Sequence, residues 1–332
     1  MQQGLDAKTA KTVNTSSVNV IVTCTNRKRA PVPDALRIRS LGRGTLPARA
    51  IAWTKRLSRS HSVKLLASEL YAGEHWSVVR RLAALGERTG RTTRVWICSA
   101  GYGMIPMDAP IQPYGATFQS GDPDAVVGSA EDAKSDAARW WSCLSKWRGP
   151  RPGSPRSLTE LAQLDPASPM LIAVSPPYLQ ALSDDARRAR EVLSDAGSLV
   201  IVSAARAPFH EIAENIVSCD ARLQVLVGGT KIGLNARLAE YILADERIDS
   251  ISVAQVRTRF EGIMKETQKA QAIERTPMTD AEVRAFIRDA LRENPKSKHS
   301  PLLRRLRDSG RACEQSRFAS LFREVLEATD GE

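Results

Sequence analysis

The sequence predicts an α/β protein with a mixed sheet and flanking helices, followed by a small C-terminal module of three helices. Short apolar, β-branched segments alternate with segments of helical periodicity, and polar residues follow where the apolar segments end. Beyond residue 276 the apolar pattern is helical only. We therefore expect a disordered leader at 1–17, an α/β domain at 18–250, a helical linker at 251–275 and the three-helix module at 276–330.

The expected strands are short apolar runs at residues 18–24, 94–98, 170–174 and 199–203, with a candidate fifth at 223–227. Helical periodicity occupies residues 48–58, 75–89, 130–147, 184–193 and 235–243, and residues 30–46 and 149–157 are typical of loops. Functional loops of such sheets lie beyond the carboxyl ends of the strands. Five places should therefore meet at one edge: Cys24, Ser99, Ser175, Ser203 and the loop 228–233.

The C-terminal module begins with a capping box in which Thr279 precedes Glu282 by three residues. A glycine-containing turn separates its second helix from its third, an order that fits a helix-turn-helix-like module. The third helix would present Gln315 and Arg317 to nucleic acid near its start. A plain bundle for packing or dimerisation fits the pattern equally well.

Positive charge is concentrated near the N-terminus. The net charge is +11, and eleven Lys or Arg residues stand between Arg27 and Lys64 against one acid, Asp34. Such a stripe suits the phosphates of nucleic acid, although a solvated loop that keeps the protein soluble would have the same composition. The candidate nucleic-acid contacts here are Arg27, Lys28, Arg29, Arg37, Arg39 and Arg43.

The five cysteines and four histidines are scattered, without a C-x-x-C pair or the spacing of a metal site. We expect neither a metal nor a cofactor. The polar leader lacks the apolar core of a secretory signal, and no apolar run approaches the length of a membrane span. The expected location is the cytoplasm, with no membrane partner.

Residues 95–118 (VWICSAGYGMIPMDAPIQPYGATF) carry the pattern of a pocket wall. Ser99 follows a strand, and Gly101 and Gly103 permit tight turns that present N–H groups. Prolines then stiffen the segment that holds Asp108 and Tyr114. All six tryptophans lie between residues 53 and 147, which suggests flat faces for stacking a base or simply a larger core.

Four segments resemble the signature of the YaaA-like superfamily: ELYAGEHW (69–76), residues 99–118, SPPYLQAL (175–182) and GGTKIGLNARLAEYIL (228–243). The resemblance covers roughly residues 18–245. Cys24 departs from the pattern, because YaaA-type proteins begin there with a Ser-Pro-x-Lys loop. The matching positions are Tyr71, Gly73, Ser99, Tyr102, Gly103, Asp108, Pro113, Tyr114, Ser175, Tyr178 and Lys231.

The cysteine at position 24, the basic loop after it and the added C-terminal module are most similar to the DpdC-type branch of that superfamily. This branch is understood to convert the 7-cyano group of a 7-deazaguanine base in DNA into a carboxamide. The resemblance thus implies a nitrile hydratase or hydrolase type of enzyme in DNA modification. Its partners would be double-stranded DNA with the modified base and other proteins of a modification cluster.

Each catalytic role is a hypothesis with a structural alternative. Cys24 beside three cations could add to the nitrile as a thiolate, or could be a small buried hydrophobe. Asp108 could activate water or cap a turn. Lys231 could protonate the nitrogen, as could Tyr102, or could bind phosphate. The residues expected to hold the base are Ser99, Gly101, Gly103, Tyr114, Ser175, Tyr178 and Tyr71.

Two other functions remain open from the sequence. One is a YaaA-like DNA-binding or damage-response protein without this catalysis. The other is a helix-turn-helix regulator whose N-terminal domain senses a base. The Cys24 thiol and the glycine-bracketed segment favour the enzyme.

Overall fold

The computed structural model describes residues 17–89, 91–127, 133–204, 209–267, 275–295 and 297–329. The chain divides into two compact units, residues 1–269 and 270–332. The expected leader falls on residues 1–16, outside the described residues, except that Ser17 already belongs to the first strand.

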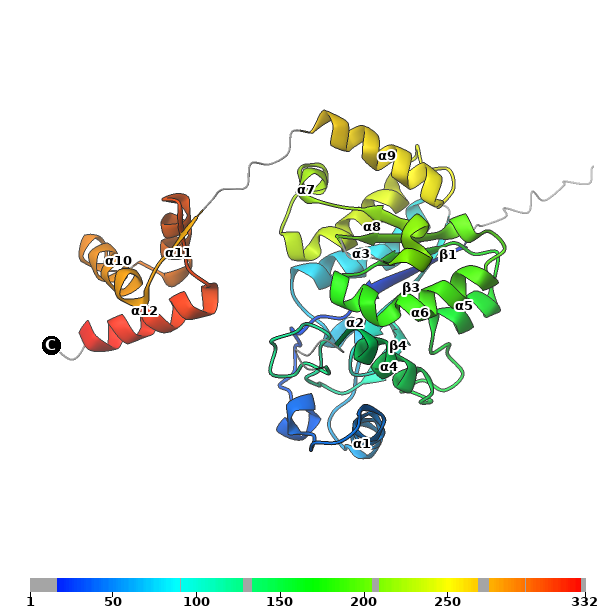
Figure 1. Ribbon diagram of the computed structural model, residues 1–332, viewed down its shortest axis with the longest axis horizontal. Helices are drawn as coiled ribbons and strands as arrows, with labels where there is room; N and C mark the ends of the chain where they lie inside the picture. The colour runs from blue at the N-terminus through cyan, green and yellow to red at the C-terminus, as the bar shows by residue number, and fades with distance from the viewer. Residues whose placement is uncertain are drawn as a thin grey trace, which may run out of the picture. The chain divides into compact units, whose positions relative to one another are not determined.

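The first unit contains a mixed six-stranded sheet with helices on both faces, as the sequence predicts (Figure 1). Five strands are parallel, and β4 is an antiparallel edge strand hydrogen-bonded to β3. The order is β4-β3-β1-β6-β7-β8. The strands are β1 (Ser17–Thr23), β3 (Thr92–Ser99), β4 (Gly103–Pro106), β6 (Met170–Ala173), β7 (Leu199–Ser203) and β8 (Ile216–Ser218).

The strand order creates a switch point between β1 and β6. The chain passes from β1 to β3 on one side, and then returns to β6 on the other side of β1. The parallel strands thus follow the 2-1-3-4-5 order of doubly wound sheets. Ligands of such sheets bind where the order reverses, beyond the carboxyl ends of the strands. In the first unit we therefore expect a ligand site at the carboxyl ends of β1 and β6.

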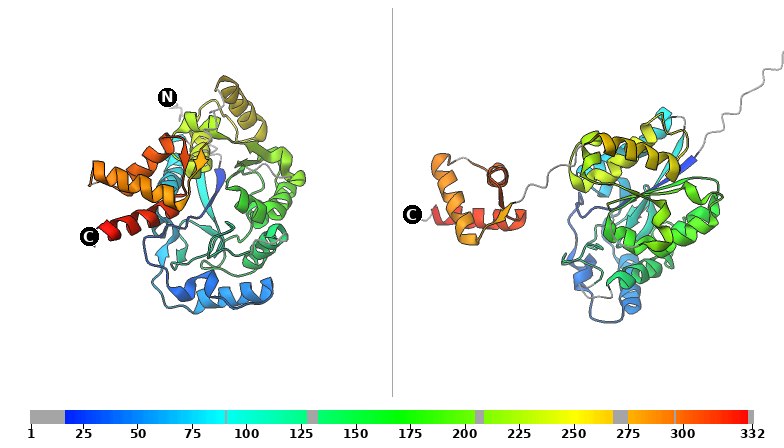
Figure 2. Two further views of the ribbon diagram at one scale, coloured as in Figure 1. Left: turned by 60° about the vertical axis from the view of Figure 1, so that its left-hand side comes forward. Right: turned by 45° about the horizontal axis from the view of Figure 1, so that its top comes forward.

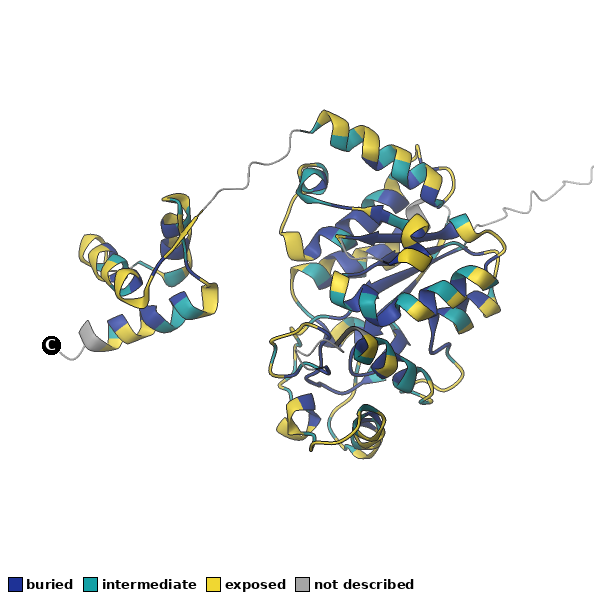
Figure 3. Cartoon of the chain, in the orientation of Figure 1, coloured by how far each residue is buried: buried dark blue, intermediate teal, exposed yellow. Residues whose placement is uncertain are grey.

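Two layers of helices cover the sheet (Figures 1 and 2). Contacts place α3, α8 and α9 against one face and α4, α5 and α6 together on the other, with α1 packed on α4. Strands β6 and β7 are buried along their whole length, which is characteristic of a parallel sheet covered on both faces (Figure 3). The helices are α1 (Leu46–Arg59), α3 (Glu74–Thr89), α4 (Ala133–Ser145), α5 (Leu158–Leu164), α6 (Pro176–Val192), α8 (Leu234–Ala244) and α9 (Val253–Glu266).

The predicted strand at 223–227 is wrong. These residues belong to helix α7 (Ala221–Val227), and the fifth parallel strand is β8, just before it. The Asp220 side chain accepts a hydrogen bond from the N–H of Arg222, and Gly228, with φ +65°, ends the helix. These end signals outweigh the apolar run.

Two further boundaries differ from expectation. Helix α6 begins at Pro176 rather than near residue 184, since proline is well tolerated in the first turn of a helix. Part of the expected linker 251–275 is helix α9, which buries Val253, Val256 and Phe260 at helical spacing and contacts β7 and β8. That helix therefore belongs to the first unit. Residues 268–274 lie outside the described residues.

The second unit has its own apolar core, which includes Ile287, Leu306 and Phe318. The predicted capping box is present, with reciprocal hydrogen bonds between Thr279 and Glu282. A short parallel pairing joins β9 (Thr276–Pro277) to β10 (Arg311–Ala312). Its helices are α10 (Asp280–Glu293), α11 (His299–Asp308) and α12 (Gln315–Thr329).

Across the described part of both units, no helix combines the length and the apolarity needed to cross a bilayer.

Candidate functional site

Cys24 and Tyr178 face each other across the switch point. Cys24 directly follows β1, and its N–H donates to the carbonyl of Cys98 at the end of β3 (2.9 Å). Tyr178 lies in the first turn of α6, after β6. The Cys24 Sγ is 3.2 Å from the Tyr178 hydroxyl, and both residues are 7% exposed. The sequence predicted that these two loops would meet, and they do.

A chain of hydroxyl groups lies beside this pair. The Tyr114 hydroxyl is 2.7 Å from that of Tyr71 and 2.7 Å from the Ser99 Oγ, and all three residues are buried. The Ser99 Oγ also accepts the N–H of Tyr102 (2.9 Å) and that of Gly101 (3.2 Å). Because its acceptor sites are used by the backbone, the Ser99 hydroxyl can donate toward Tyr114, which in turn can donate to Tyr71.

The turn from β3 to β4 requires its glycines. A Cβ on Gly101 would lie 2.4 Å from Cδ2 of the Tyr114 ring, and Gly103 has φ +72°. Two buried tryptophans hold the turn: the Trp53 indole donates to the Gly101 carbonyl (2.7 Å) and Trp140 to that of Ala100 (2.8 Å). These indoles position the turn and belong to the core, so they offer no stacking face for a base.

Lys28 joins the cluster, although the sequence suggested a contact with nucleic acid. The segment after Cys24 runs antiparallel beside residues 70–72, with a bridge between Lys28 and Tyr71. The Lys28 Nζ lies 4.4 Å from the centre of the Tyr114 ring and donates to the carbonyl of Thr25 (3.1 Å). Burial lowers the pKa of this amine, and the nearby Cys24 opposes that effect.

Burial also raises the pKa values of the Tyr71, Tyr114 and Tyr178 hydroxyls well above their ordinary value, and a charge on Cys24 raises them further. The three phenols therefore remain protonated at neutral pH. A protonated Tyr178 can donate to the Cys24 sulfur. The site thus combines a thiol, a proton donor in contact with it and an amine. Cys24 and Lys28 lie on the segment that follows β1, and Tyr178 lies on α6 (Figure 1).

The other predicted catalytic residues lie elsewhere. The Tyr102 hydroxyl accepts the N–H of Gln112 (3.0 Å), although its ring packs edge-on against Tyr114. Asp108 is exposed and forms an ion pair with Arg151. Lys231 is exposed in the short helix before α8, and Ser175 is half-buried at the start of α6. None of these side chains touches Cys24 among the contacts of the described residues.

The residues around the loop 228–233 and the start of α8 form a different arrangement. The buried Arg237 reaches back to the loop 228–233, where it bonds the carbonyl of Thr230 and pairs with Glu74 (2.5 Å). The Cys219 Sγ donates to Asn235 Oδ1 (3.1 Å), and burial raises the pKa of this thiol to about 12. These residues form a packed connection between the loop 228–233, α3 and α8, and the Asn235 amide joins it to the carbonyl of Val174 after β6.

The candidate nucleic-acid contacts fall into two groups, arginines that are paired with carboxylates and residues that are exposed. Arg37 pairs with the buried Asp124 (3.0 Å), and Arg39 lies 3.7 Å from the same carboxylate. Arg317 pairs with Asp280 and donates to the carbonyl of Met278 (2.9 Å). The remaining candidates are exposed: Arg27, Arg29, Arg43 and Gln315.

Arg156 supports the site but was not among the predicted site residues. It lies in the segment 149–157, where the sequence predicts a loop. Its buried guanidinium donates to the carbonyls of Tyr102 and Met104, next to the Gly103 turn, and to that of Trp147 (3.0 Å). Burial lowers its pKa to about 10. No sequence signal distinguishes this arginine from the exposed ones around it, because its partners are backbone carbonyls.

Among the described residues, no three His, Cys, Asp or Glu side chains gather in a way that could hold a metal ion. No family model matches the chain, and no curated protein and no solved structure matches it either.

Proposed function

We propose that the first unit is an enzyme that hydrates the nitrile of a 7-cyano-7-deazaguanine base in DNA to the carboxamide. One observation carries the proposal: the Cys24 sulfur sits at the β1/β6 switch point, 3.2 Å from the Tyr178 hydroxyl, with the Lys28 amine in the same cluster. The YaaA-like resemblance, in its DpdC-type form, suggests the substrate.

The reaction proceeds through a thioimidate. The Cys24 sulfur forms a bond to the nitrile carbon and one C–N π bond opens. The thiol proton passes to the Tyr178 oxygen while the Tyr178 proton passes to the nitrile nitrogen, which leaves Tyr178 neutral. Water then adds to the same carbon and gives up a proton to Lys28 in its neutral form. The tetrahedral intermediate expels the Cys24 sulfur and leaves the carboxamide. The Lys28 proton passes to the expelled sulfur, and the proton of the added hydroxyl moves to the nitrogen, so the net change is the addition of one water.

The base is held on the opposite side by the hydroxyl chain of Ser99, Tyr114 and Tyr71, whose buried oxygens match the polar edge of a deazaguanine. In this scheme Lys28 takes the place of Asp108 as the base for water and of Lys231 as the cation near the nitrile. Asp108 is already paired with Arg151, and Lys231 is exposed.

A base in duplex DNA must leave the stack to reach Cys24, at a cost of roughly a few kcal/mol. The exposed Arg27, Arg29 and Arg43 lie on the segment that follows Cys24 and can hold the flanking phosphates. Since Cys24 is 7% exposed, this segment has to shift to admit the base.

The test is mass analysis of nucleosides from duplex DNA that carries the cyano base, after incubation with the full chain. We expect the cyano nucleoside to gain one water. Cys24→Ala should abolish the gain, whereas the matched control Cys143→Ser, a half-buried free cysteine of α4, should keep it. Trapping of the base on Cys24 as a thioimidate, located by peptide mass mapping, would identify the nucleophile.

An unchanged nitrile would refute the enzyme. If the chain still bound the modified duplex more tightly than the unmodified one, the cluster around Cys24 would act as a base sensor. Equal binding of both duplexes would indicate a DNA-binding protein of the YaaA-like kind that does not recognise the modified base. Full activity in Cys24→Ala would instead show that water attacks the nitrile directly.

A further inference from the structure

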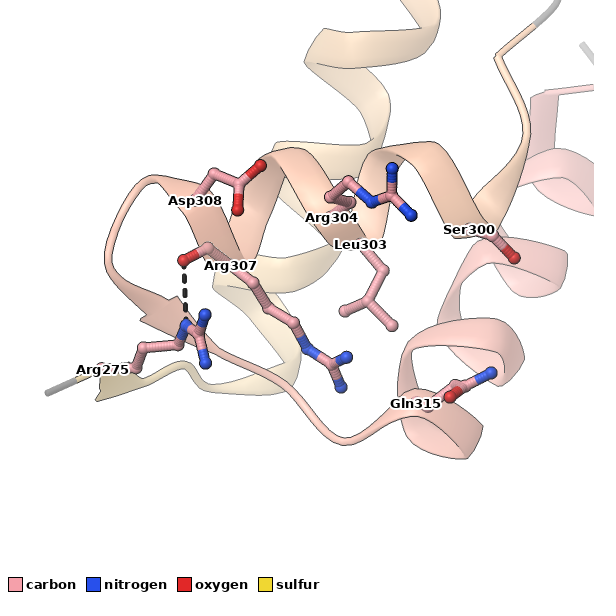
Figure 4. A pocket seen from close by; sticks show the side chains of 7 residues that line it. All are labelled: Arg275, Ser300, Leu303, Arg304, Arg307, Asp308 and Gln315. Atoms are coloured by element: carbon pink, nitrogen blue, oxygen red, sulfur yellow. Dashed lines mark hydrogen bonds between the residues drawn. The ribbon is translucent and has the colours of Figure 1, made fainter. Parts of the chain in front are cut away.

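Three arginines of the second unit line one pocket. Arg304 and Arg307 lie on α11, Arg275 precedes β9, and the pocket has a volume of about 280 Å³. Leu303 forms part of its wall, and Gln315 borders it at the first residue of α12 (Figure 4). Arg275, Arg304 and Gln315 are exposed, so the pocket is open to solvent.

Several other arginines of this unit are held by carboxylates, whereas Arg288, Arg311 and Arg323 lack a carboxylate partner among the described residues but do not line the pocket. Arg284 pairs with Glu324 (2.8 Å), Arg305 with Glu293 (2.7 Å) and Arg317 with Asp280.

In contrast, no carboxylate of the described residues pairs with the three arginines of the pocket. Arg275 donates through Nε to the carbonyl of Arg307 (2.9 Å), and Arg307 donates to the carbonyl of Cys313 (3.0 Å). Arg304 makes no side-chain hydrogen bond or ion pair within the described residues. Most of the N–H groups of these three guanidiniums therefore have no partner within the described residues and remain available to a ligand (Figure 4).

The ligand that fits this arrangement is a phosphate group. A guanidinium donates through a planar fork that matches the oxygens of a phosphate, and three arginines line this pocket against one carboxylate residue, Asp308. Arg304 and Arg307 are three residues apart on α11 and therefore share one face of the helix.

The N–H groups at the start of α12 contribute little to the binding of an anion. The Glu314 carboxylate already accepts the N–H groups of Ser316 (2.9 Å) and Arg317 (2.8 Å). The hydrogen bond from the Ser316 hydroxyl, together with these two N–H groups, lowers the pKa of Glu314 to about 2, so the cap stays charged. The guanidinium groups must therefore supply the binding, with the Gln315 amide as a neutral neighbour.

We propose that this pocket binds the backbone of duplex DNA, with Arg304, Arg307 and Arg275 on its phosphates and the Gln315 amide beside them. An open row of cations suits a polyanion that passes over the surface better than a small enclosed anion. The expected contact Arg317 is occupied by Asp280, and Arg304 takes that role. The proposal concerns the second unit and does not depend on the chemistry of Cys24.

Fluorescence anisotropy of the full chain on a short unmodified duplex, measured over a range of salt concentrations, tests this surface. We expect Arg304→Gln to weaken binding about threefold to tenfold and to reduce the slope of log K against log salt by about 0.9, the loss of one phosphate contact. The matched control is Arg305→Gln, which removes the same charge from the next residue of α11, but from an arginine already paired with Glu293. It should keep nearly full affinity.

If the two variants lost affinity for the duplex equally, the effect would come from net charge alone and the proposal would be overturned. An unchanged affinity of Arg304→Gln would overturn it as well. Binding to vesicles of anionic lipid that depends on Arg304, with no effect on the duplex, would assign the surface to membranes and overturn it too. The duplex in this assay carries no cyano base, so the binding result does not depend on the reaction at Cys24. A failure of the nitrile chemistry is thereby separated from a failure of this surface.

Discussion

The two halves of the sheet edge differ in what they do with their polar residues. At β1, β3 and β6, a thiol, an amine and four hydroxyls meet in one cluster. In the other half, around the start of α8, Cys219 bonds to Asn235 and Arg237 pairs with Glu74. The Asn235 amide also donates to the carbonyl of Val174, just after β6. Both halves thus lie near the carboxyl ends of one sheet, but in the second half α3 and α8 pack on each other and their polar side chains serve as partners in that packing.

The largest predicted effect tests whether the cluster around Cys24, in the first half, is the reactive one, by removing its proton donor. We expect Tyr178→Phe to slow conversion of the cyano base about a hundredfold, because the Cys24 sulfur and the nitrile nitrogen lose their donor. Nucleoside mass analysis over time gives the rate. Lys231→Met and Cys219→Ser, on the second half, should convert at the normal rate. A comparable loss in Lys231→Met would show that the two halves form one site.

A second prediction concerns the packing of the first half. Gly101→Ala places a methyl group against the ring of Tyr114, whose hydroxyl bonds tie it to Tyr71 and Ser99. We expect the free energy of unfolding to fall by about 2 kcal/mol, as for an overpacked core. Urea unfolding measures it.

The control for that variant is Gly262→Ala. This exposed glycine of α9 has no atom near the added Cβ, and alanine there should raise stability by roughly 0.5–1 kcal/mol through helix propensity. If Gly101→Ala were as stable as the wild type, the ring of Tyr114 would be free to move and the hydroxyl chain would be loosely held.

The smallest predicted effect is electrostatic. Burial lowers the pKa of Lys28, so the folded protein releases this proton at a lower pH than the unfolded chain does. Between the folded value and the ordinary 10.5, the unfolded state binds more protons, and the free energy of unfolding therefore rises with pH. Lys28→Met should flatten this rise in urea unfolding across the alkaline range. Lys55→Met, at an exposed position of α1, should keep the wild-type slope.

Much of the fold could be predicted because its signals are local. The apolar runs of β1, β3, β6 and β7, and the capping box of α10, are properties of short segments. The strand predicted at 223–227 is wrong for a related reason. Its apolar run is typical of a strand, but the Asp220 cap and Gly228 make the segment a helix.

The candidate site was predictable only in part. Ser99, Tyr114, Tyr71 and Tyr178 were chosen from the sequence, and the structure brings them together around Cys24. Asp108 was chosen from the same segment and lies outside the cluster. Its neighbours in the sequence gave no sign that Arg151, from a distant loop, would pair with it.

Local signals in the sequence specify the alternating order of strands and helices, the polar residues at the strand ends and the clustering of charge. The partner of each charged side chain depends on the tertiary structure. Arg37 pairs with Asp124 and Arg317 with Asp280, and Arg156 donates its hydrogen bonds to backbone carbonyls, whereas Lys28 joins the cluster around Cys24 and Arg304 stays unpaired among the described residues. The physical reason is that a backbone segment encodes its own conformation, whereas the partner of a side chain depends on residues that only folding brings near.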